Sequence, residues 1–341
     1  MPLQIEKTFP RLWSIHSGVA MIVTDLHGNW DVYQRYRDRF IQLLHNGEAD
    51  CLIFTGDLIH SSSDSVPDKS LEIIVDFLEL QAGYGDRVIF LCGNHELPHI
   101  YGFGLGKGEK EFTPPFEAAL SRTSHRSAVI NLFMSLPFYL RTAAGVTITH
   151  AGAIEAINDP ETALKLFTWD HKAYIAKADA LLAEMDVEGM RRAYAKLSGA
   201  ATYDELARHY LAVNDADDPR YDDLLRGMLV TMYSDFKHLR SALFTKCESE
   251  IGKDAYSDIV VGFLEVLSKD FRPQHLLVAG HIEVPGSYQI VGKNHFRLAS
   301  GSHATPLKAG QYLLLDTEKP VEEVERLLNN LYDIQSIKTD S

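Results

Sequence analysis

Side chains that could bind metal ions follow short apolar segments at five points along the chain. The endings, in chain order, are Asp25 with His27, Asp57, Asn94 with His95, His150, and His281. A single histidine after a strand is usually structural, but five such endings in one chain predict a shared site. Carboxylate, amide and imidazole groups suit Mn²⁺ or Fe, with Zn²⁺ as an alternative, and the lack of cysteine among them argues against a structural zinc.

An aspartate among these residues could lie between two ions. One carboxylate shared by two cations lets them lie roughly 3.5–4 Å apart, the spacing that two-metal hydrolases use. Such a pair lowers the pKa of a bridging water and holds two phosphoryl oxygens. Glycines next to the predicted ligands allow the backbone to approach closely: Gly28, Gly56, Gly93, Gly152 and Gly280. A set of this kind therefore suits a pair of divalent ions.

The stretch Asp25-Leu26-His27-Gly28 follows an apolar segment, residues 19–23, that predicts a buried strand. Because strand side chains alternate in direction, Asp25 and His27 are expected on the same side of an extended chain. Open α/β sheets bind their ligands at the carboxyl ends of strands, which fits a metal site here. Taken alone, the stretch could equally be a polar turn between a strand and a helix.

The elements that must position these residues begin with a βαβαβ pattern. Strands are predicted within 11–24, at 50–55 and at 86–92, with helices at 29–46 and 68–82, and this order predicts a parallel sheet. Residues 102–108 are rich in glycine and predict a mobile loop. Further strands and helices are expected at 115–135 (helix), 137–140, 145–149, 276–279, 288–291, 295–299, 311–316 (strands) and 320–332 (helix).

Residues 155–270 differ in composition, because alanine, leucine and acidic residues dominate. Helices are expected near 160–167, 173–197, 202–212, 219–230 and 253–269. We interpret this region as a helical insertion or cap within a single domain of residues 1–341. Its acidic segments predict a solvated face that a protein partner could bind, and they lack the spacing of a calcium-binding EF-hand loop.

Composition excludes several classes of protein. The formal net charge of −14 argues against broad nucleic-acid binding, which needs a basic face. Three cysteines without a C-x-x-C pair indicate a reducing compartment. The N-terminal residues are too polar for a signal peptide, and no apolar run approaches the length of a membrane span. We expect a cytoplasmic protein with no membrane contact, or export by an uncleaved route.

The same residues carry a resemblance to the calcineurin-like metallophosphoesterases, in five motifs that run in the family's order. They are Asp25-Leu26-His27-Gly28, Gly56-Asp57, Gly93-Asn94-His95-Glu96, His150-Ala151-Gly152 and Gly280-His281. The particular forms are similar to those of the serine/threonine phosphoprotein phosphatase branch and its bacterial diadenosine-tetraphosphatase relatives. The resemblance covers about 1–152 and 272–316. It implies an α/β fold of two packed β-sheets, a sandwich flanked by helices, with the site at the strand ends.

The resemblance also implies roles. Six residues would hold the two ions: Asp25, His27 and His281 at the first, Asn94 and His150 at the second, and Asp57 between them. A hydroxide that bridges the metals would attack phosphorus. His95 would protonate the leaving oxygen, with Glu96 supporting it from behind.

One stretch departs from the family's protein phosphatases, which usually have GDxVDRG. The chain has Gly56-Asp57-Leu58-Ile59-His60-Ser61-Ser62, so His60 replaces an aspartate and Ser61 replaces the arginine that binds phosphate. We expect Asn94, Asn29 and His60 to contact substrate instead. Further candidates are Arg122, Arg126 and Lys107 for charge and His303 for lining the site.

The substrate is expected to be a phosphate monoester, with phosphoserine or phosphothreonine protein as the first choice. A dinucleoside polyphosphate or another small phosphate ester is the alternative. A non-catalytic scaffold is disfavoured, because all six matched positions keep residue types that bind metal.

Overall fold

The computed structural model describes residues 2–63, 66–244 and 247–334. The chain forms two compact units. The first, which we call the sandwich unit, contains Met1–Asn94, Leu136–Trp169 and His238–Ser341. The second, the helical unit, contains His95–Ser135 and Asp170–Lys237. Each unit is described separately.

The larger sheet of the sandwich unit has seven strands, in the spatial order β1-β2-β8-β9-β10-β13-β12. Their bounds are Gln4–Phe9 (β1), Leu12–Ser17 (β2), Tyr139–Thr142 (β8), Val146–Thr149 (β9), Leu276–Ala279 (β10), His295–Leu298 (β13) and Tyr288–Val291 (β12). Strand β10 pairs in parallel with both β9 and β13, so the carboxyl ends of these three strands lie at one edge.

The smaller sheet has five strands, in the order β16-β15-β3-β4-β5. Their bounds are Leu331–Asp333 (β16), Gln311–Asp316 (β15), Val19–Val23 (β3), Cys51–Phe54 (β4) and Val88–Phe90 (β5). Strands β3, β4 and β5 are parallel neighbours, with Met21 opposite Leu52 and Leu52 opposite Val88. The predicted parallel arrangement of the first three βα repeats is confirmed.

The core lies between the two sheets. Ile22, Ile53 and Ile89 come from the parallel strands of the smaller sheet, and Ile148 and Val278 from the larger one. All five side chains are fully buried in one continuous apolar cluster. Because strand side chains alternate, each sheet can give one apolar face to this core and keep the other for helices. The predicted two-sheet sandwich is confirmed.

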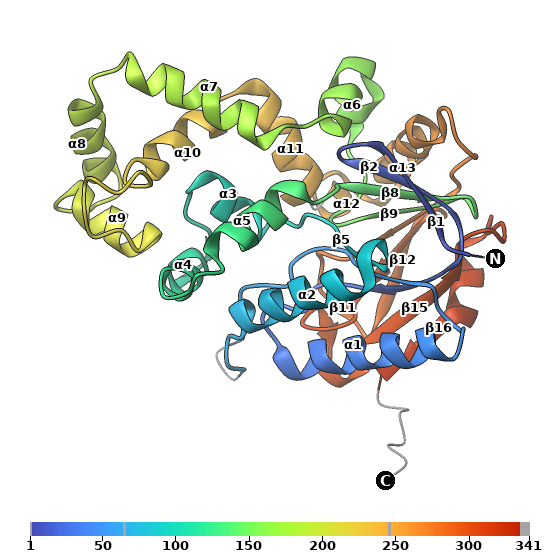
Figure 1. The fold of residues 1–341 in the computed structure, drawn as a ribbon. Coiled ribbons are helices and arrows are strands. Elements are labelled where there is room, and N and C mark those ends of the chain that lie inside the picture. Colours follow the sequence, from blue (N-terminus) through green and yellow to red (C-terminus); the bar gives the residue numbers. More distant parts are fainter. Residues whose placement is uncertain (1, 64–65, 245–246, 335–341) are drawn as a thin grey trace, which may run out of the picture. The chain divides into compact units, whose positions relative to one another are not determined.

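Helices α1 (Trp30–His45) and α2 (Ser70–Tyr84) pack on the outer face of the smaller sheet, where Figure 1 shows them side by side. The ring of Phe54, on β4, stacks on Tyr33 of α1 and makes an edge contact with Phe77 of α2. Asn29 ends the turn before α1, since its side chain accepts a hydrogen bond from the N–H of Val32. This cap fixes where the helix begins after the β3 loop.

The remaining elements are mostly helical. The helical unit holds α3 (Leu97–Tyr101), β6 (Gly106–Lys107), β7 (Lys110–Glu111), α4 (Thr113–Leu120), α5 (Arg126–Ser135), α7 (His171–Ala183), α8 (Val187–Leu197), α9 (Tyr203–Leu211) and α10 (Asp223–Thr231). Elsewhere the chain forms α6 (Pro160–Phe167), α11 (Ser234–Phe244), α12 (Cys247–Ile251), α13 (Lys253–Ser268), β11 (Val284–Pro285), β14 (Ala304–Thr305) and short 3₁₀ turns.

Several predicted elements differ from the structure. The single helix expected at 115–135 is wrong, because α4 and α5 are separated by a polar turn over residues 121–125. The helix expected at 173–197 is also two helices, since Asp186 caps a new start at α8. The helix expected at 320–332 is a 3₁₀ segment (Val324–Asn330) that leads into β16, whose pairing with β15 takes over the last residues. Residues 102–108 include β6, and α11 and α12 were not predicted.

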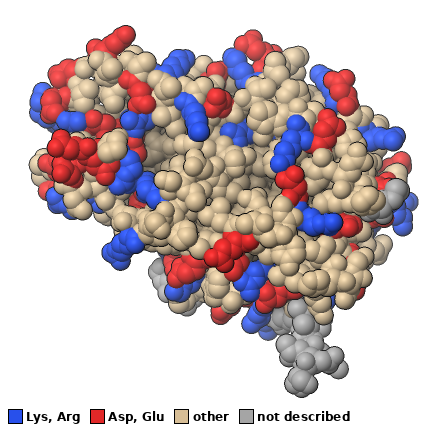
Figure 2. All heavy atoms as spheres, viewed as in Figure 1, with Lys and Arg blue, Asp and Glu red and all other residues tan. Residues whose placement is uncertain are grey.

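The division into one domain with an insertion at 155–270 stays a prediction. Within the described residues, no helix combines the length and apolar character needed to cross a bilayer. On the face shown in Figure 2, acidic and basic side chains are interspersed.

Candidate metal centre

The carboxyl ends of β3, β4 and β5 bring the first predicted ligands together. The N–H of His27 donates to the carbonyl of Asp57 at 3.0 Å, and the N–H of Gly28 donates to Leu58 at 2.8 Å. These bonds continue the pairing of β3 with β4 beyond the strands themselves. As a result, the loops that carry the DxHG and GD motifs are held against each other.

Asp25 and His27 are not on an extended strand, which corrects the expectation from side-chain alternation. Strand β3 ends at Val23, and Asp25 and His27 have φ values of 40° and 47°. Five of the seven non-glycine residues with positive φ in the described chain belong to this site: Asp25, His27, Asp57, His60 and His281. Such left-handed residues cost energy and persist where surrounding bonds impose them, which is common at functional sites.

The larger sheet supplies His150 after β9 and His281 after β10. The N–H of Gly280 donates to the carbonyl of His150 at 3.0 Å, and the N–H of His281 donates to Asp25 Oδ2 at 2.9 Å. The second bond joins the edges of the two sheets. Gly280 has no room for a side chain, because a Cβ would overlap the Asp25 carboxylate.

One cluster of possible ligands contains Asp57, His150 and His281, whose donor atoms all lie within 4.8 Å of one another. His150 Nε2 lies 3.4 Å from Asp57 Oδ2 and 2.9 Å from the side-chain oxygen of Asn94. The family resemblance had placed His281 with Asp25 and His27. The structure instead groups its imidazole with the residues expected at the second ion.

A second cluster contains Asp25, His27 and His303. His303 Nδ1 lies 3.4 Å from Asp25 Oδ1, and its Nε2 lies 3.2 Å from His27 Nε2. The two rings meet edge to face, with centroids 4.8 Å apart. The sequence analysis named His303 only as a residue that could line the site.

Backbone carbonyls fix the tautomers of three histidines. His27 Nδ1 donates to the carbonyl of His60, His150 Nδ1 donates to Thr55, and His281 Nε2 donates to Phe244. In the neutral form of each ring, the other nitrogen carries a lone pair. Metal-binding histidines are usually oriented in this way, by a hydrogen bond from the nitrogen that does not bind the ion.

The charge state of the cluster also fits a bound cation. Asp25 is fully buried, and within the described chain its Oδ1 accepts no hydrogen bond. Burial raises the pKa of Asp25 to about 7, although the N–H of His281 opposes the shift. Burial and then the neighbouring His281 hold the pKa of His150 well below its ordinary value, which favours the neutral ring. Buried carboxylates with neutral imidazoles can bind divalent ions without loss of protons from the rings.

The other predicted residues lie as follows. His95 and Glu96 belong to the helical unit, where both are buried and the His95 ring lies 5.0 Å from that of Phe112. Asn29 caps α1, and its side chain lies beside His27 in a small cavity. His60 is fully buried, and its carbonyl orients His27. Their roles in catalysis or substrate binding stay predictions.

Arg297, on β13, is a residue that sequence reasoning missed. Its fully buried guanidinium donates from Nη1 to the carbonyls of Ala151 and Gly280 and from Nε to Glu248. Ala151 follows His150 and Gly280 precedes His281, so one side chain holds both ligand loops. The available signal was an arginine between two apolar residues, Phe296 and Leu298, of a predicted strand.

A cavity of about 220 Å³ lies next to His27 in the sandwich unit. The described residues that line it are His27, Asn29, Ser61, Ser62, Ser63, Val66, Ser302 and Leu307. Ser61, the position at which the family's protein phosphatases have an arginine, thus lies in a lining of hydroxyl and amide groups. This lining can donate hydrogen bonds but adds no formal positive charge.

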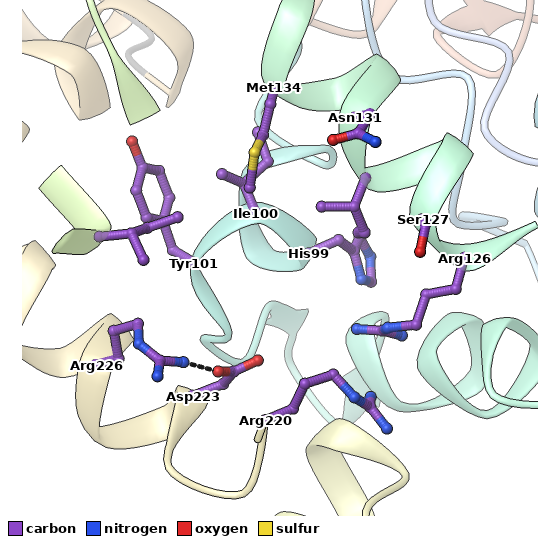
Figure 3. A pocket seen from close by; sticks show the side chains of 12 residues that line it. His99, Ile100, Tyr101, Arg126, Ser127, Asn131, Met134, Arg220, Asp223 and Arg226 are labelled. Carbon is purple, nitrogen blue, oxygen red and sulfur yellow. Dashed lines mark hydrogen bonds and ion pairs between the residues drawn. The ribbon is translucent and has the colours of Figure 1, made fainter. Parts of the chain in front are cut away.

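A separate pocket of about 420 Å³ lies within the helical unit (Figure 3). Arg126, Arg220 and Arg226 line it, together with apolar side chains of α3 and α5. Each arginine is paired with a carboxylate, and Figure 3 shows the pair of Arg226 with Asp223. The positive charges are thus already matched within this unit.

Arg126 makes its ion pair with Glu117, which is almost completely buried. His99 Nδ1 also contacts this carboxylate, at 2.7 Å. Burial alone would raise the pKa of Glu117, but the hydrogen bond and charge of His99, with Arg126, outweigh it and hold the pKa below its ordinary value. Arg126 therefore has a structural role in the helical unit.

The sequence pattern of the calcineurin-like phosphoesterases matches residues 19–217, more than half of the chain. The chain belongs to this family. The resemblance inferred from the five motifs is thereby confirmed, together with the α/β fold. Calcineurin-like phosphoesterases are metal-dependent, and the two clusters described above give this member residues that could bind metal.

Solved structures that match the chain include two phosphatases. A cold-active protein-tyrosine phosphatase from a Shewanella species has a TM-score of 0.45 and 15% identity, over 92% of this calcineurin-like chain and 79% of its own. A protein serine/threonine phosphatase from Saccharomyces cerevisiae has a TM-score of 0.48 and 14% identity, over 95% and 83%. A metallophosphoesterase from Sphaerobacter thermophilus has a TM-score of 0.32 and 11% identity, over 89% of this chain and 85% of its own. No curated protein matches the sequence.

Proposed function

We propose that this protein is a metal-dependent phosphoric ester hydrolase that uses two divalent ions. The observation that carries the proposal is the position of Asp57 Oδ2. This oxygen lies 3.9 Å from His27 Nε2, in one cluster, and 3.4 Å from His150 Nε2, in the other. A carboxylate between two sets of ligands is the arrangement that a two-metal site requires.

Asp25, His27 and Asp57 would hold one ion, with Asp57, Asn94, His150 and His281 at the other. The ions, when bound, would activate water and neutralise charge on the phosphoryl oxygens. The protein's own groups then orient the ester, and a protonated His95 transfers its proton to the leaving oxygen as the P–O bond breaks. Water supplies the new oxygen on phosphorus, so no covalent enzyme intermediate is required.

The proposed substrate is a phosphate monoester, with phosphoserine or phosphothreonine in a protein as the first choice. The cavity next to His27 supports a second choice, a small phosphate ester with a polar leaving group. Its volume of about 220 Å³ and its hydroxyl and amide lining suit a compact molecule that forms hydrogen bonds. The conversion of phosphopeptides, sugar phosphates and dinucleoside polyphosphates at fixed Mn²⁺ would distinguish these substrates.

The first test is hydrolysis of an aryl phosphate by Asp57→Asn and His95→Ala variants. We expect kcat/KM to fall by about 100-fold or more in each, because one loses the bridging carboxylate and the other the general acid. Asp86→Asn and His125→Ala are matched controls, since both side chains are exposed, and they should keep full activity. Undiminished turnover by either site variant would refute the mechanism. A wild-type protein that binds no metal and shows no turnover with added Mn²⁺ would favour the scaffold alternative.

A further inference from the structure

We infer that His303 is an additional metal ligand, on the side of the centre that Asp25 and His27 form. The inference rests on the proposed two-metal function, and His303 lies outside the five motifs of the family. Its side chain is 17% exposed, and its two ring nitrogens face Asp25 Oδ1 and His27 Nε2. It follows β13 at the same edge at which β9 and β10 end.

The distance between the two imidazoles matches a shared ion. Nitrogen ligands lie about 2.0–2.1 Å from Zn²⁺, so two ligands on one ion are about 2.9 Å apart at a right angle and about 3.4 Å apart in a tetrahedron. His303 Nε2 and His27 Nε2 are 3.2 Å apart. Because His27 Nδ1 donates to the carbonyl of His60, its Nε2 lone pair points at this position.

The loop that carries His303 is fixed by backbone bonds. The N–H of Ser302 donates to the carbonyl of Asp25 at 3.1 Å, and the N–H of Val284 donates to the carbonyl of His303 itself at 2.9 Å. Ser300 exchanges hydrogen bonds with Thr24 in both directions. The ring is therefore held against Asp25 by its own main chain, as a ligand must be.

A simple hydrogen bond between the two imidazoles is the alternative interpretation. His303 would then donate from Nε2 to His27 and act as a positioning residue for Asp25 and His27. The two interpretations differ in one chemical property, since only a ligand places its own donor atom on the ion. The test therefore changes that donor atom and observes the metal directly.

The first experiment measures bound metal in the wild-type protein and in His303→Ala, after reconstitution with Mn²⁺ and with Co²⁺. We expect two ions in the wild type, and one of them bound at least about 100-fold more weakly in the variant, since loss of a ligand should exceed the 10–100-fold effect of losing an outer partner. Equal stoichiometry and affinity in both proteins would overturn the inference about His303. A wild type that binds no metal would instead overturn the proposed function.

The second experiment uses a His303→Cys variant loaded with Co²⁺. A thiolate bound to cobalt gives a charge-transfer band in the near ultraviolet, and we expect this band in the difference spectrum against the wild type. His125→Cys, at an exposed position of the helical unit, is the matched control and should add no band. A correctly folded His303→Cys protein that binds cobalt without the band would show that position 303 is not a ligand.

Discussion

Replacement of Arg297 tests whether one buried side chain supports two ligand loops. Its guanidinium donates to the carbonyl of Ala151 at 2.5 Å, to that of Gly280 at 2.6 Å and to Glu248 Oε1 at 2.5 Å. The Arg297 side chain is 1% exposed and that of Glu248 is 11% exposed. Removal of the arginine therefore leaves an acidic side chain with little solvent and without its cation.

The expected loss of stability follows from these partners. A buried carboxylate that loses its ion-pair partner costs about 3–5 kcal/mol. A buried carbonyl without a donor costs about 1–3 kcal/mol more. Ala151 would be such a carbonyl, whereas Gly280 also accepts from the N–H of Ile282. The lower ends of both ranges give about 4 kcal/mol for Arg297→Ala, against a typical total of about 5–15 kcal/mol.

The assay is urea unfolding followed by circular dichroism. Arg297→Lys should fold even if the alanine variant does not, because it keeps the charge while losing the fork that reaches both carbonyls. Arg326→Ala is the matched control, since its pair with Glu323 has side chains 63% and 66% exposed, and it should change stability by less than about 1 kcal/mol. A double variant, Arg297→Ala with Glu248→Ala, should recover part of the loss by removing the stranded carboxylate.

Metal affinity gives a second readout for Arg297→Lys. Because the loops hold His150 and His281, we expect one ion to bind about 10–100-fold more weakly, as for other outer partners of metal ligands.

A loss of less than about 1 kcal/mol in the free energy of unfolding of Arg297→Ala, or no recovery of stability in the double variant, would refute the reasoning.

Two further predictions follow from buried contacts in the two units. Gly280→Ala should displace the Asp25 carboxylate and lower the free energy of unfolding by about 1–3 kcal/mol, as overpacking does. The control Gly83→Ala should not, because the space around Gly83 is open. Equal urea midpoints for the two variants would contradict this prediction. Glu117→Gln should cost about 3–5 kcal/mol near neutral pH. The folded pKa of Glu117 is lower than its ordinary value of 4.5, so the ionised side chain stabilises the folded state fully above 4.5. This stabilisation is lost as the pH falls through the folded pKa. Thermal unfolding followed by circular dichroism should therefore show an acid-side loss of stability in the wild type that the variant lacks. An unchanged acid limb would contradict it.

The sequence predicted most strands of the sandwich, because most of them are short, largely apolar segments bounded by polar residues or glycine. The strands predicted around β3, β4, β9, β10 and β15 lie where expected. Strands β3, β4 and β10 are continuous apolar runs that are almost completely buried, which is the simplest strand signal in a sequence. The pattern could not show where long helical stretches break. Asp186, which caps α8, looks like any acidic residue on a polar face until the hydrogen bond that it accepts from the N–H of Gly189 is seen.

Contacts within the site were harder to predict than the residues that make them. Pattern reasoning assigned Asp25, His27, Asp57, Asn94, His150 and His281 to one sheet edge, whereas in the structure they follow strands of two different sheets. It could not show which histidine faces which carboxylate, because this depends on how the two sheets meet. His281 is 256 residues from Asp25 in the chain, yet its backbone N–H donates a hydrogen bond to the Asp25 carboxylate.

The local conformation at Asp25 explains why the simplest rule failed there. Alternation along a strand would point Asp25 and His27 to one side, but both residues have left a strand geometry for positive φ. Left-handed conformations of this kind cost of order 1–3 kcal/mol each, which no local sequence pattern favours. The compensation is tertiary. The N–H groups of His281 and Ser302 donate to Asp25, and the N–H groups of His27 and Gly28 donate to carbonyls of the loop after β4. Proteins depart from local rules mostly where function requires it.

The same bonds imply that metal binding and the joining of the two sheets are linked. Asp25 uses Oδ2 and its carbonyl to hold the loops after β10 and β13, and leaves Oδ1 for the cluster with His27 and His303. An ion on Oδ1 would offset the cost of burying this carboxylate, which raises its pKa to about 7. The residue that holds the sheet edges together would then also be stabilised by the ion. A change in the loop of His303, or in the packing around Gly280, should therefore affect both stability and metal affinity.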